Sequence, residues 1–419
     1  MNSRGCAEAV VRKRCFVHLA GYEPVGADQS HRRFIREMAR FKDTWNVQGS
    51  VSLPRYSPDQ CMVSWTVHTW GPNWRLDTEF HNLLWDDFVT ADMQVSDWRR
   101  IPLGVAAMMD FILSGTASKY LVAAWRYFLF FLYPLSAFTA IVSLAILLAW
   151  SVTVRGGLPH HSASVTVLSL TVLFLLWRLL REKLQLRHAL DNWSFARDFV
   201  YRGRPQFEER LNRFAQELLR LASETEADEI VVFGHSLGVP ISLIVIDRAL
   251  KFGAEFSGRS KPIHLVSSGS SLLKVALHPA AGWLREVAYR VANVPGIYWV
   301  EFQALSDPLG FYKVDPMIAL DMAHTGKPIV KIIRLSRMLK KATYRRLKLN
   351  FSRMHRQTLM GNELRYAYDY YMLSCGPIGL PYWVENFDRI IAAFGNDGAL
   401  VMCSSVAAAQ SAREVEVAP

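Results

Sequence analysis

The chain has 419 residues, of which 51% are hydrophobic and 20% are charged, and its formal net charge is +11. This composition argues against a disordered protein and allows both a sizeable core and a membrane component. Five scattered cysteines without a C-x-x-C pair argue against a disulfide framework or a zinc cluster and suit a reducing compartment. The start "MNSRGCAEAVVRKRCF" contains no long apolar core before a cleavage site, so we expect no secretory signal peptide.

Residues 1–119 are predicted to form the N-terminal part of an α/β domain. "RCFVHLAGYEP" predicts a short buried strand that ends near Gly21. "DQSHRRFIREMARFKDTWNV" has apolar residues at helical spacing, and "QCMVSWTVHTW" and "WRLDTEFHNLLW" predict two paired strands. "IPLGVAAMMDFILSGTASKY" predicts a helix that lies near the membrane surface or packs on the soluble domain.

Residues 120–181 are predicted to form a transmembrane helical hairpin, with helices at about 127–150 and 163–180. The 28 residues between Arg126 and Arg155 carry no charge, which exceeds the roughly 20 apolar residues that a span needs. The second helix is shorter and has Arg178 near its end, where a long side chain can reach the interface. An interfacial or core helix is the alternative for this second segment.

The charges around the hairpin predict its orientation. The connecting loop "RGGLPHHS" has a single fixed charge, whereas both outer flanks are rich in arginine and lysine. The positive-inside rule therefore puts both flanks in the cytoplasm. We expect an integral membrane protein of the bacterial inner (plasma) membrane, with the α/β domain facing the cytoplasm.

Residues 182–403 are predicted to complete the α/β domain, and 404–419 to form a disordered tail. "PQFEERLNRFAQELLRLASE" is an amphipathic helix. Strand candidates follow in "EIVVF", "KPIHLVSSG", "IYWVEFQAL" and "KPIVKIIRL", separated by helical or loop stretches. Strands that alternate with helices predict a mostly parallel sheet flanked by helices.

The motif "GHSLG", residues 234–238, joins the strand "EIVVF" to the helix "VPISLIVIDRAL". A serine on such a sharp strand-to-helix turn projects its hydroxyl at the top of the sheet, and the two glycines leave room for the neighbouring strand and helix. The helix that follows directs its positive dipole end toward a developing oxyanion. This context predicts Ser236 as a nucleophile rather than a chance glycine turn.

At these residues the chain resembles the α/β-hydrolase superfamily, specifically its lipase-like members with a GHSLG elbow. The resemblance extends over most of the non-membrane residues in order, although only the elbow is specific. It implies an α/β-hydrolase-type sheet interrupted by the hairpin. It also implies a serine, acid and histidine triad in that chain order that hydrolyses an acyl group.

Within this resemblance the acid follows a later strand. Asp307 is the candidate, because the strand "IYWVEFQAL" ends in the turn Ser306-Asp307-Pro308. Asp315, also followed by proline, is the alternative, and an Asp-Pro pair can serve turn formation alone.

The base should follow the acid. His355, in the helical stretch after the last strand candidate, is the preferred base, and His324 is the alternative. His235 occupies a variable position of the motif and is not expected to be catalytic. His18 is expected to be structural or to orient a loop.

Two backbone N–H groups should hold the oxyanion. One is that of Leu237, directly after the nucleophile. The other is that of Tyr22, in the loop after the first strand. "HLAGYEP" departs from the common His-Gly form of this loop, so the second donor is the less defined of the two.

Ten basic residues and no acidic residue lie between Lys331 and Arg356. Interleaved apolar side chains make this stretch amphipathic, which in a membrane protein indicates contact with anionic lipid head groups. A solvated positive face is the alternative, and no motif for nucleic acid accompanies the charge. We expect the stretch to form a lid or a mouth, and neutralising Arg345, Arg346 and Lys348 to weaken activity on vesicles more than on a soluble ester.

The sequence thus predicts a membrane-anchored serine hydrolase, lipase- or esterase-like, that cleaves a lipid-derived acyl ester through an acyl-enzyme. Neither a metal nor an organic cofactor is expected. Two alternatives remain: an acyltransferase on the same fold, and a catalytically inactive membrane scaffold.

Overall fold

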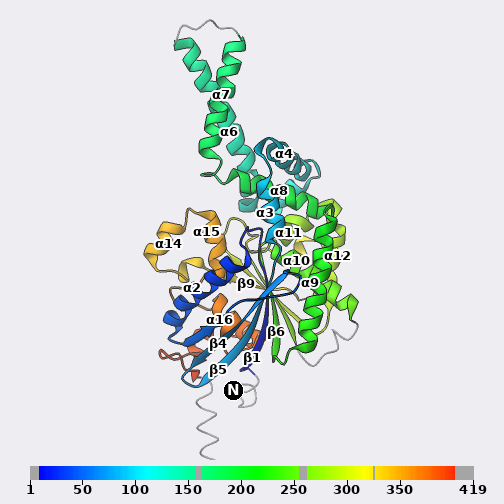
Figure 1. Cartoon of the computed structure of the whole chain (residues 1–419), viewed down its shortest axis with the longest axis vertical. Helices are drawn as coiled ribbons and strands as arrows, with labels where there is room; N and C mark the ends of the chain where they lie inside the picture. The colour runs from blue at the N-terminus through cyan, green and yellow to red at the C-terminus, as the bar shows by residue number, and fades with distance from the viewer. Residues whose placement is uncertain (1–8, 156–161, 254–261, 324–325, 402–419) are drawn as a thin grey trace, which may run out of the picture. The chain divides into compact units, whose positions relative to one another are not determined.

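The computed structural model describes residues 9–155, 162–253, 262–323 and 326–401 (Figure 1). The chain divides into two compact units. The first comprises Met1–Asp87, Arg204–Ala276 and Gly282–Pro419, and the second comprises Phe88–Gly203 and Leu277–Ala281. The second unit therefore begins before the hairpin expected at 120–181 and ends after it. The tail expected at 404–419 lies outside the described residues.

A nine-stranded sheet forms the centre of the first unit. Its strands are β1 (Lys13–Leu19), β2 (Gln48–Val51), β3 (Arg55–Tyr56), β4 (Met62–Gly71), β5 (Trp74–Leu83), β6 (Glu229–His235), β7 (Ile263–Ser268), β8 (Ile297–Ala304) and β9 (Ile329–Ile333). The order is β2-β4-β5-β1-β6-β7-β8-β9, with β3 beside β4. β1 pairs in parallel with β5 and β6, and the ladder stays parallel to β9. β4 is antiparallel to its neighbours.

Helices cover both faces of this sheet (Figure 1). One face carries α2 (Ala27–Trp45), α14 (Lys341–Leu347), α15 (Phe351–Arg356) and α16 (Tyr370–Cys375). The other carries α9 (Pro205–Glu224), α10 (Gly238–Phe252) and α12 (Gly282–Asn293). Short helices α11 (Leu272–Ala276), α13 (Pro316–Ala319) and α17 (Leu380–Glu385) complete the unit. The mixed α/β class with a mostly parallel sheet flanked by helices is confirmed.

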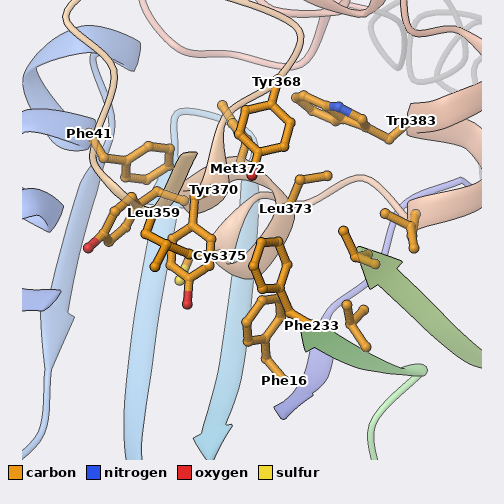
Figure 2. Close-up of a cluster of buried hydrophobic side chains, with 14 of the residues drawn as sticks. Phe16, Phe41, Phe233, Leu359, Tyr368, Tyr370, Met372, Leu373, Cys375 and Trp383 are labelled. Atoms are coloured by element: carbon orange, nitrogen blue, oxygen red, sulfur yellow. The ribbon is translucent and has the colours of Figure 1, made fainter. Parts of the chain in front are cut away.

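The core on the α2 face is unusually aromatic, as Figure 2 shows. Phe16 of β1 stacks on Phe233 of β6 with ring centroids 5.8 Å apart, and Tyr370 of α16 meets both rings edge-on. Such pairs add stabilisation beyond their buried area, of about 0.5–1.5 kcal/mol each. They hold β1 and β6 in register at the centre of the sheet.

The strand order reverses between β1 and β6, since the chain leaves β1 toward β5 on one side and continues from β6 to β9 on the other. In open parallel sheets ligands bind outside the carboxyl ends of the strands at such a reversal. The residues that follow β1 and β6 therefore lie where a site is expected.

The second unit is helical. Its helices are α4 (Asp97–Leu113), α5 (Thr116–Ala123), α6 (Trp125–Arg155), α7 (Ser162–Leu180) and α8 (Leu186–Val200), and α3 (Asp86–Gln94) begins at its boundary. The single helix predicted over 101–120 is wrong in one respect. The chain breaks at Gly115, whose φ of 77° is left-handed, and α4 and α5 are bent by 71° at this break.

Among the described helices, α6 alone is long and apolar enough to cross a membrane by length and composition. Its second half exposes large apolar side chains such as Leu147 (63% exposed) and Trp150 (59%). The apolar part of α7 is shorter, and it packs along α6 and exposes Val167 and Phe174. A span by both helices stays a prediction.

Candidate active site

Ser236 follows β6 directly and precedes α10, as the motif predicted. Its φ is 55°, a left-handed conformation that costs a residue with a side chain of order 1–3 kcal/mol. Hydrogen bonds on both sides hold this conformation: the Ser236 N–H donates to the Ser268 carbonyl, and the Ser236 carbonyl accepts from the Ser271 and Val239 N–H groups. Backbone strain that the surroundings enforce in this way is typical of a functional turn.

The glycines of the motif have a steric reason. A Cβ at Gly238 would clash with the carbonyl oxygen of Leu19, at the end of β1. A Cβ at Gly234 would lie 2.8 Å from both the Gly238 carbonyl oxygen and Ser242 Oγ. The turn can therefore lie against β1 and α10 only because both positions lack a side chain.

Asp307 lies in the turn after β8, and its side chain is buried. Oδ1 accepts a hydrogen bond from the Leu309 N–H at 3.0 Å, which fixes the carboxylate. Oδ2 lies 2.7 Å from Nδ1 of His355, on α15. Because an ionised carboxylate only accepts, Nδ1 donates, and in the neutral imidazole Nε2 is left as the proton acceptor.

His355 is buried (6% exposed), and burial by itself disfavours its charged form. The charge of Asp307 and its hydrogen bond outweigh burial, so the pKa of His355 lies above its ordinary value of 6.5. The charge of Glu23 acts in the same direction, and that of Arg356 acts against it. Nε2 is buried and has no hydrogen-bond partner among the described residues.

The hydroxyl of Ser236 is hydrogen-bonded to the Ser271 hydroxyl at 3.2 Å, and Nε2 of His355 makes no hydrogen bond to it or to another described residue. The structure thus brings together Asp307 with His355, and Ser236 with Ser271. The loop after β7 contributes Ser271 to one pair and lies against the other, because a Cβ at Gly269 would lie 2.7 Å from Cε1 of His355 and 3.4 Å from Asp307 Oδ2.

Of the two predicted oxyanion donors, Leu237 follows the nucleophile directly, and Tyr22 follows a glycine that lies against it. The Leu237 N–H makes no hydrogen bond to another described residue. A Cβ at Gly21 would lie 2.8 Å from Cβ of Ser236, so the loop after β1 reaches the turn directly before Tyr22. The Tyr22 side chain is buried near Trp85, with ring centroids 6.1 Å apart, and this contact holds the loop.

His235 and His18 are both buried and take no part in the Asp307–His355 pair. The His235 ring lies 4.5 Å from that of His355, centroid to centroid, and Nε2 lies 3.3 Å from the His355 carbonyl oxygen. Burial, together with the neighbouring His355, lowers the pKa of His235 to about 3, so His235 is neutral at pH 7. His18 packs on Phe233 and contacts the Tyr370 hydroxyl, which is a structural role.

The alternative residues are placed differently. Asp315 caps α13, where its Oδ1 accepts from the N–H groups of Met317 and Ile318. His324 lies outside the described residues. No group of three or more His, Cys, Asp or Glu side chains that could hold a metal ion occurs in the described ranges.

Sequence reasoning missed Ser271, Gly269 and Glu23 as neighbours of the site. The stretch "SSGSS" after a strand was a possible signal for the first two, because a glycine among serines marks a tight turn at the carboxyl edge of a sheet. Glu23 has no signal of its own, since its proximity to His355 comes from the fold.

Comparisons with protein families, with curated proteins and with solved structures find no match to this chain.

Proposed function

We propose that the first unit is a serine hydrolase of the α/β-hydrolase superfamily that cleaves an acyl ester, and that the second unit anchors it to a membrane. The observation that carries the proposal is a strained serine after β6 at the same sheet edge as a buried Asp307–His355 pair. The three residues follow β6, β8 and β9 in that chain order, which is the order of the superfamily to which the motif is similar.

In the proposed reaction, substrate binding breaks the hydrogen bond between the Ser236 and Ser271 hydroxyls. The Ser236 hydroxyl then donates a hydrogen bond to Nε2 of His355 instead. Apo sites often have such catalytic hydrogen bonds unformed. His355 takes the hydroxyl proton while Oγ bonds to the acyl carbon, and Asp307 stabilises the imidazolium. His355 then gives the proton to the leaving alkoxide as the ester C–O bond breaks. Water, activated by the same histidine, hydrolyses the acyl-enzyme.

The oxyanion of each tetrahedral intermediate is proposed to be held by the Leu237 N–H and by that of Tyr22. The N-terminus of α10 adds its dipole at the same place. One donor in such a hole contributes about 2.7–4 kcal/mol to transition-state stabilisation.

Membrane anchoring is supported by α6 and by the apolar side chains that α6 and α7 leave exposed. Exposed apolar surface of this extent indicates a contact with lipid or another protein. With arginine and lysine on both outer flanks, we propose a hairpin in the bacterial plasma membrane with the hydrolase unit in the cytoplasm.

A serine-directed fluorophosphonate probe tests the proposal on the full chain in detergent. We expect labelling of the wild type and its loss in Ser236→Ala, with losses of about 10⁴-fold in rate for Asp307→Asn. His355→Ala should be similarly impaired. Ser271→Ala is the matched control. The Ser271 hydroxyl lies beside that of Ser236 but has no histidine assigned to it as a base, so this variant should remain labelled.

Labelling that survives in Ser236→Ala and is lost in Ser271→Ala would move the nucleophile. An unlabelled wild type would contradict a hydrolase and favour the scaffold. Transfer of the acyl group to an added alcohol or thiol in preference to water would identify an acyltransferase.

A further inference from the structure

A pocket of about 590 Å³ lies between α2 and the segment that contains α14 and α15, which are side by side in Figure 1. Its walls hold a single carboxylate, Glu363, and an unusual number of guanidinium groups. The arginines that line it are Arg32, Arg33, Arg36, Arg40, Arg346, Arg353 and Arg356. Four of them come from one helix and three from a segment some three hundred residues later.

Three of these arginines have carboxylate partners. Arg33 pairs with Glu23, and Arg36 and Arg40 both pair with Glu37. The other four form no ion pair with another described residue: Arg32, Arg346, Arg353 and Arg356. The oxygens of Glu363 are already occupied by the Lys340 N–H and the Thr343 hydroxyl.

Like charges around one cavity repel each other, and the repulsion is relieved when an anion binds among them. The walls contain arginine and no lysine, although Lys340, Lys341 and Lys348 lie in the same segment. The planar guanidinium fork matches two oxygens of a phosphate group, which an ammonium does not. The volume is within the range of small-molecule sites.

The pocket adjoins the candidate active site through two residues. Arg356 follows His355 directly on α15 and lines the pocket. Arg33 pairs with Glu23, whose charge acts on His355 and whose own pKa is lowered against the effect of burial by Arg33, His235 and Arg356. The pocket is therefore adjacent to the candidate base through Arg356, and it shares Arg33 with the charge network around His355.

We propose that this pocket binds a phosphate group, and that the substrate of the hydrolase is a phosphate-bearing acyl ester. The phosphate-bearing substrate rests on the function proposed above, whereas the binding of phosphate in the pocket does not. The phosphate can belong to a membrane lipid or to a soluble ester, since the guanidinium groups recognise the same oxygens in both.

The test uses inorganic pyrophosphate as a soluble probe and the full chain in detergent, with binding measured by calorimetry. The pocket variant is the double substitution Arg346→Gln and Arg353→Gln. The matched control is Arg345→Gln with Lys348→Gln, which removes the same charge from exposed neighbours outside the pocket walls. We expect pyrophosphate to bind at least tenfold more weakly to the pocket variant and unchanged to the control.

Equal weakening in both variants would overturn the pocket, because it would show that only diffuse surface charge attracts pyrophosphate. No binding to the wild type would overturn the pocket as well. Because binding is measured without catalysis, the two proposals fail separately. Binding without fluorophosphonate labelling sinks the hydrolase and keeps the phosphate site. Labelling without binding sinks the phosphate site and keeps the hydrolase.

Two substrates identify the source of the phosphate. One is a soluble acyl ester with a phosphate, compared with its analogue without the phosphate. The other is phosphatidic acid in detergent micelles, compared with diacylglycerol, which has the same acyl esters but no phosphate. We expect the preference for at least one phosphate-bearing form to fall at least tenfold in the pocket variant and to persist in the control. A preference that is absent in the wild type for both pairs would refute the phosphate-bearing substrate.

Discussion

Single atoms decide the geometry around the candidate base. The Asp307 carboxylate fixes Nδ1 of His355, and the backbone of Gly269 lies against the same imidazole where any side chain would displace it. The site therefore depends on a glycine that takes no part in the proposed chemistry.

Gly269→Ala should slow fluorophosphonate labelling by at least tenfold. Its Cβ would lie 2.7 Å from Cε1 of His355, and its φ is 56°. The matched control is Gly296→Ala, because Gly296 also has a positive φ, of 85°, but nothing within 4 Å of the added Cβ. Both variants carry a similar backbone strain of about 1–2 kcal/mol. Equal labelling of the two would contradict a positioning role for Gly269.

The pH profile reports the state of His355. The base acts in its neutral form, so labelling should decline as pH falls through its pKa, which lies above 6.5. Glu23→Gln removes a charge that raises this pKa and should move the acidic limb to lower pH. Burial and Arg356, which lower the pKa, remain, as do the Asp307 contacts that raise it.

Glu363→Gln is the control for this shift, because the charges that shift the pKa of His355 most are those of Asp307, Glu23 and Arg356. Labelling rates between pH 5 and 9 would be compared for the three proteins. A limb that stays in place in Glu23→Gln, or moves to higher pH, would show that Glu23 has no influence on the base.

At the scale of elements, a buried ion pair joins the amino-terminal halves of β1 and β6 to the C-terminal segment. Arg14 is 1% exposed and Glu229 is 2% exposed, and their nitrogen and oxygen approach to 2.6 Å. Arg14 also donates to the carbonyls of Gly376 and Ile378, before α17. Two strands and a distant segment therefore depend on one guanidinium.

Arg14→Met should destabilise the protein by about 3–5 kcal/mol, because it leaves the Glu229 carboxylate buried without its main partner. The double variant with Glu229→Gln should recover part of the loss. Lys13→Met, which breaks the adjacent exposed pair with Glu226, should have little effect on the unfolding transition. A double variant less stable than Arg14→Met would contradict this account of the loss.

At the scale of the whole molecule, one chain combines a buried aromatic core around a sheet with a helix that exposes apolar side chains along its second half. The buried core is typical of a protein domain in water, whereas the exposed apolar side chains of α6 are typical of a helix in lipid. In a bilayer the exposed surface of α6 is favourable, whereas in water it would drive aggregation.

Leu147→Arg should reduce the fraction of the protein that resists carbonate extraction from membranes. An arginine costs about 2.5–3.5 kcal/mol in insertion at the centre of a span and less toward its ends, and Leu147 lies in the second half of α6. Leu349→Arg is the matched control, since Leu349 is 81% exposed but belongs to the first unit. If both variants extract like the wild type, α6 does not depend on the bilayer.

Much of the fold follows from local patterns in the sequence. Alternating and helical periodicities predicted β1, β4 to β9, α2, α9 and α10, because each repeats over one face of a long element. β2, β3 and the short helices α16 and α17 were not predicted, since their conformation depends on packing against the rest of the core. Ser236 with its strand and helix is a local feature, and the sequence alone was enough to locate it.

The rest was decided by tertiary structure. From the sequence, Asp307 and Asp315 were both candidates for the acid, and His355 and His324 for the base. Only the fold brings Asp307 Oδ2 to 2.7 Å from Nδ1 of His355. It also separates Arg346, in the pocket wall, from Arg345 and Lys348, which the sequence had grouped with it, and adds the arginines of α2. Side chains that meet across hundreds of residues leave no periodic trace in the chain, because their proximity is set by the order of strands in the sheet.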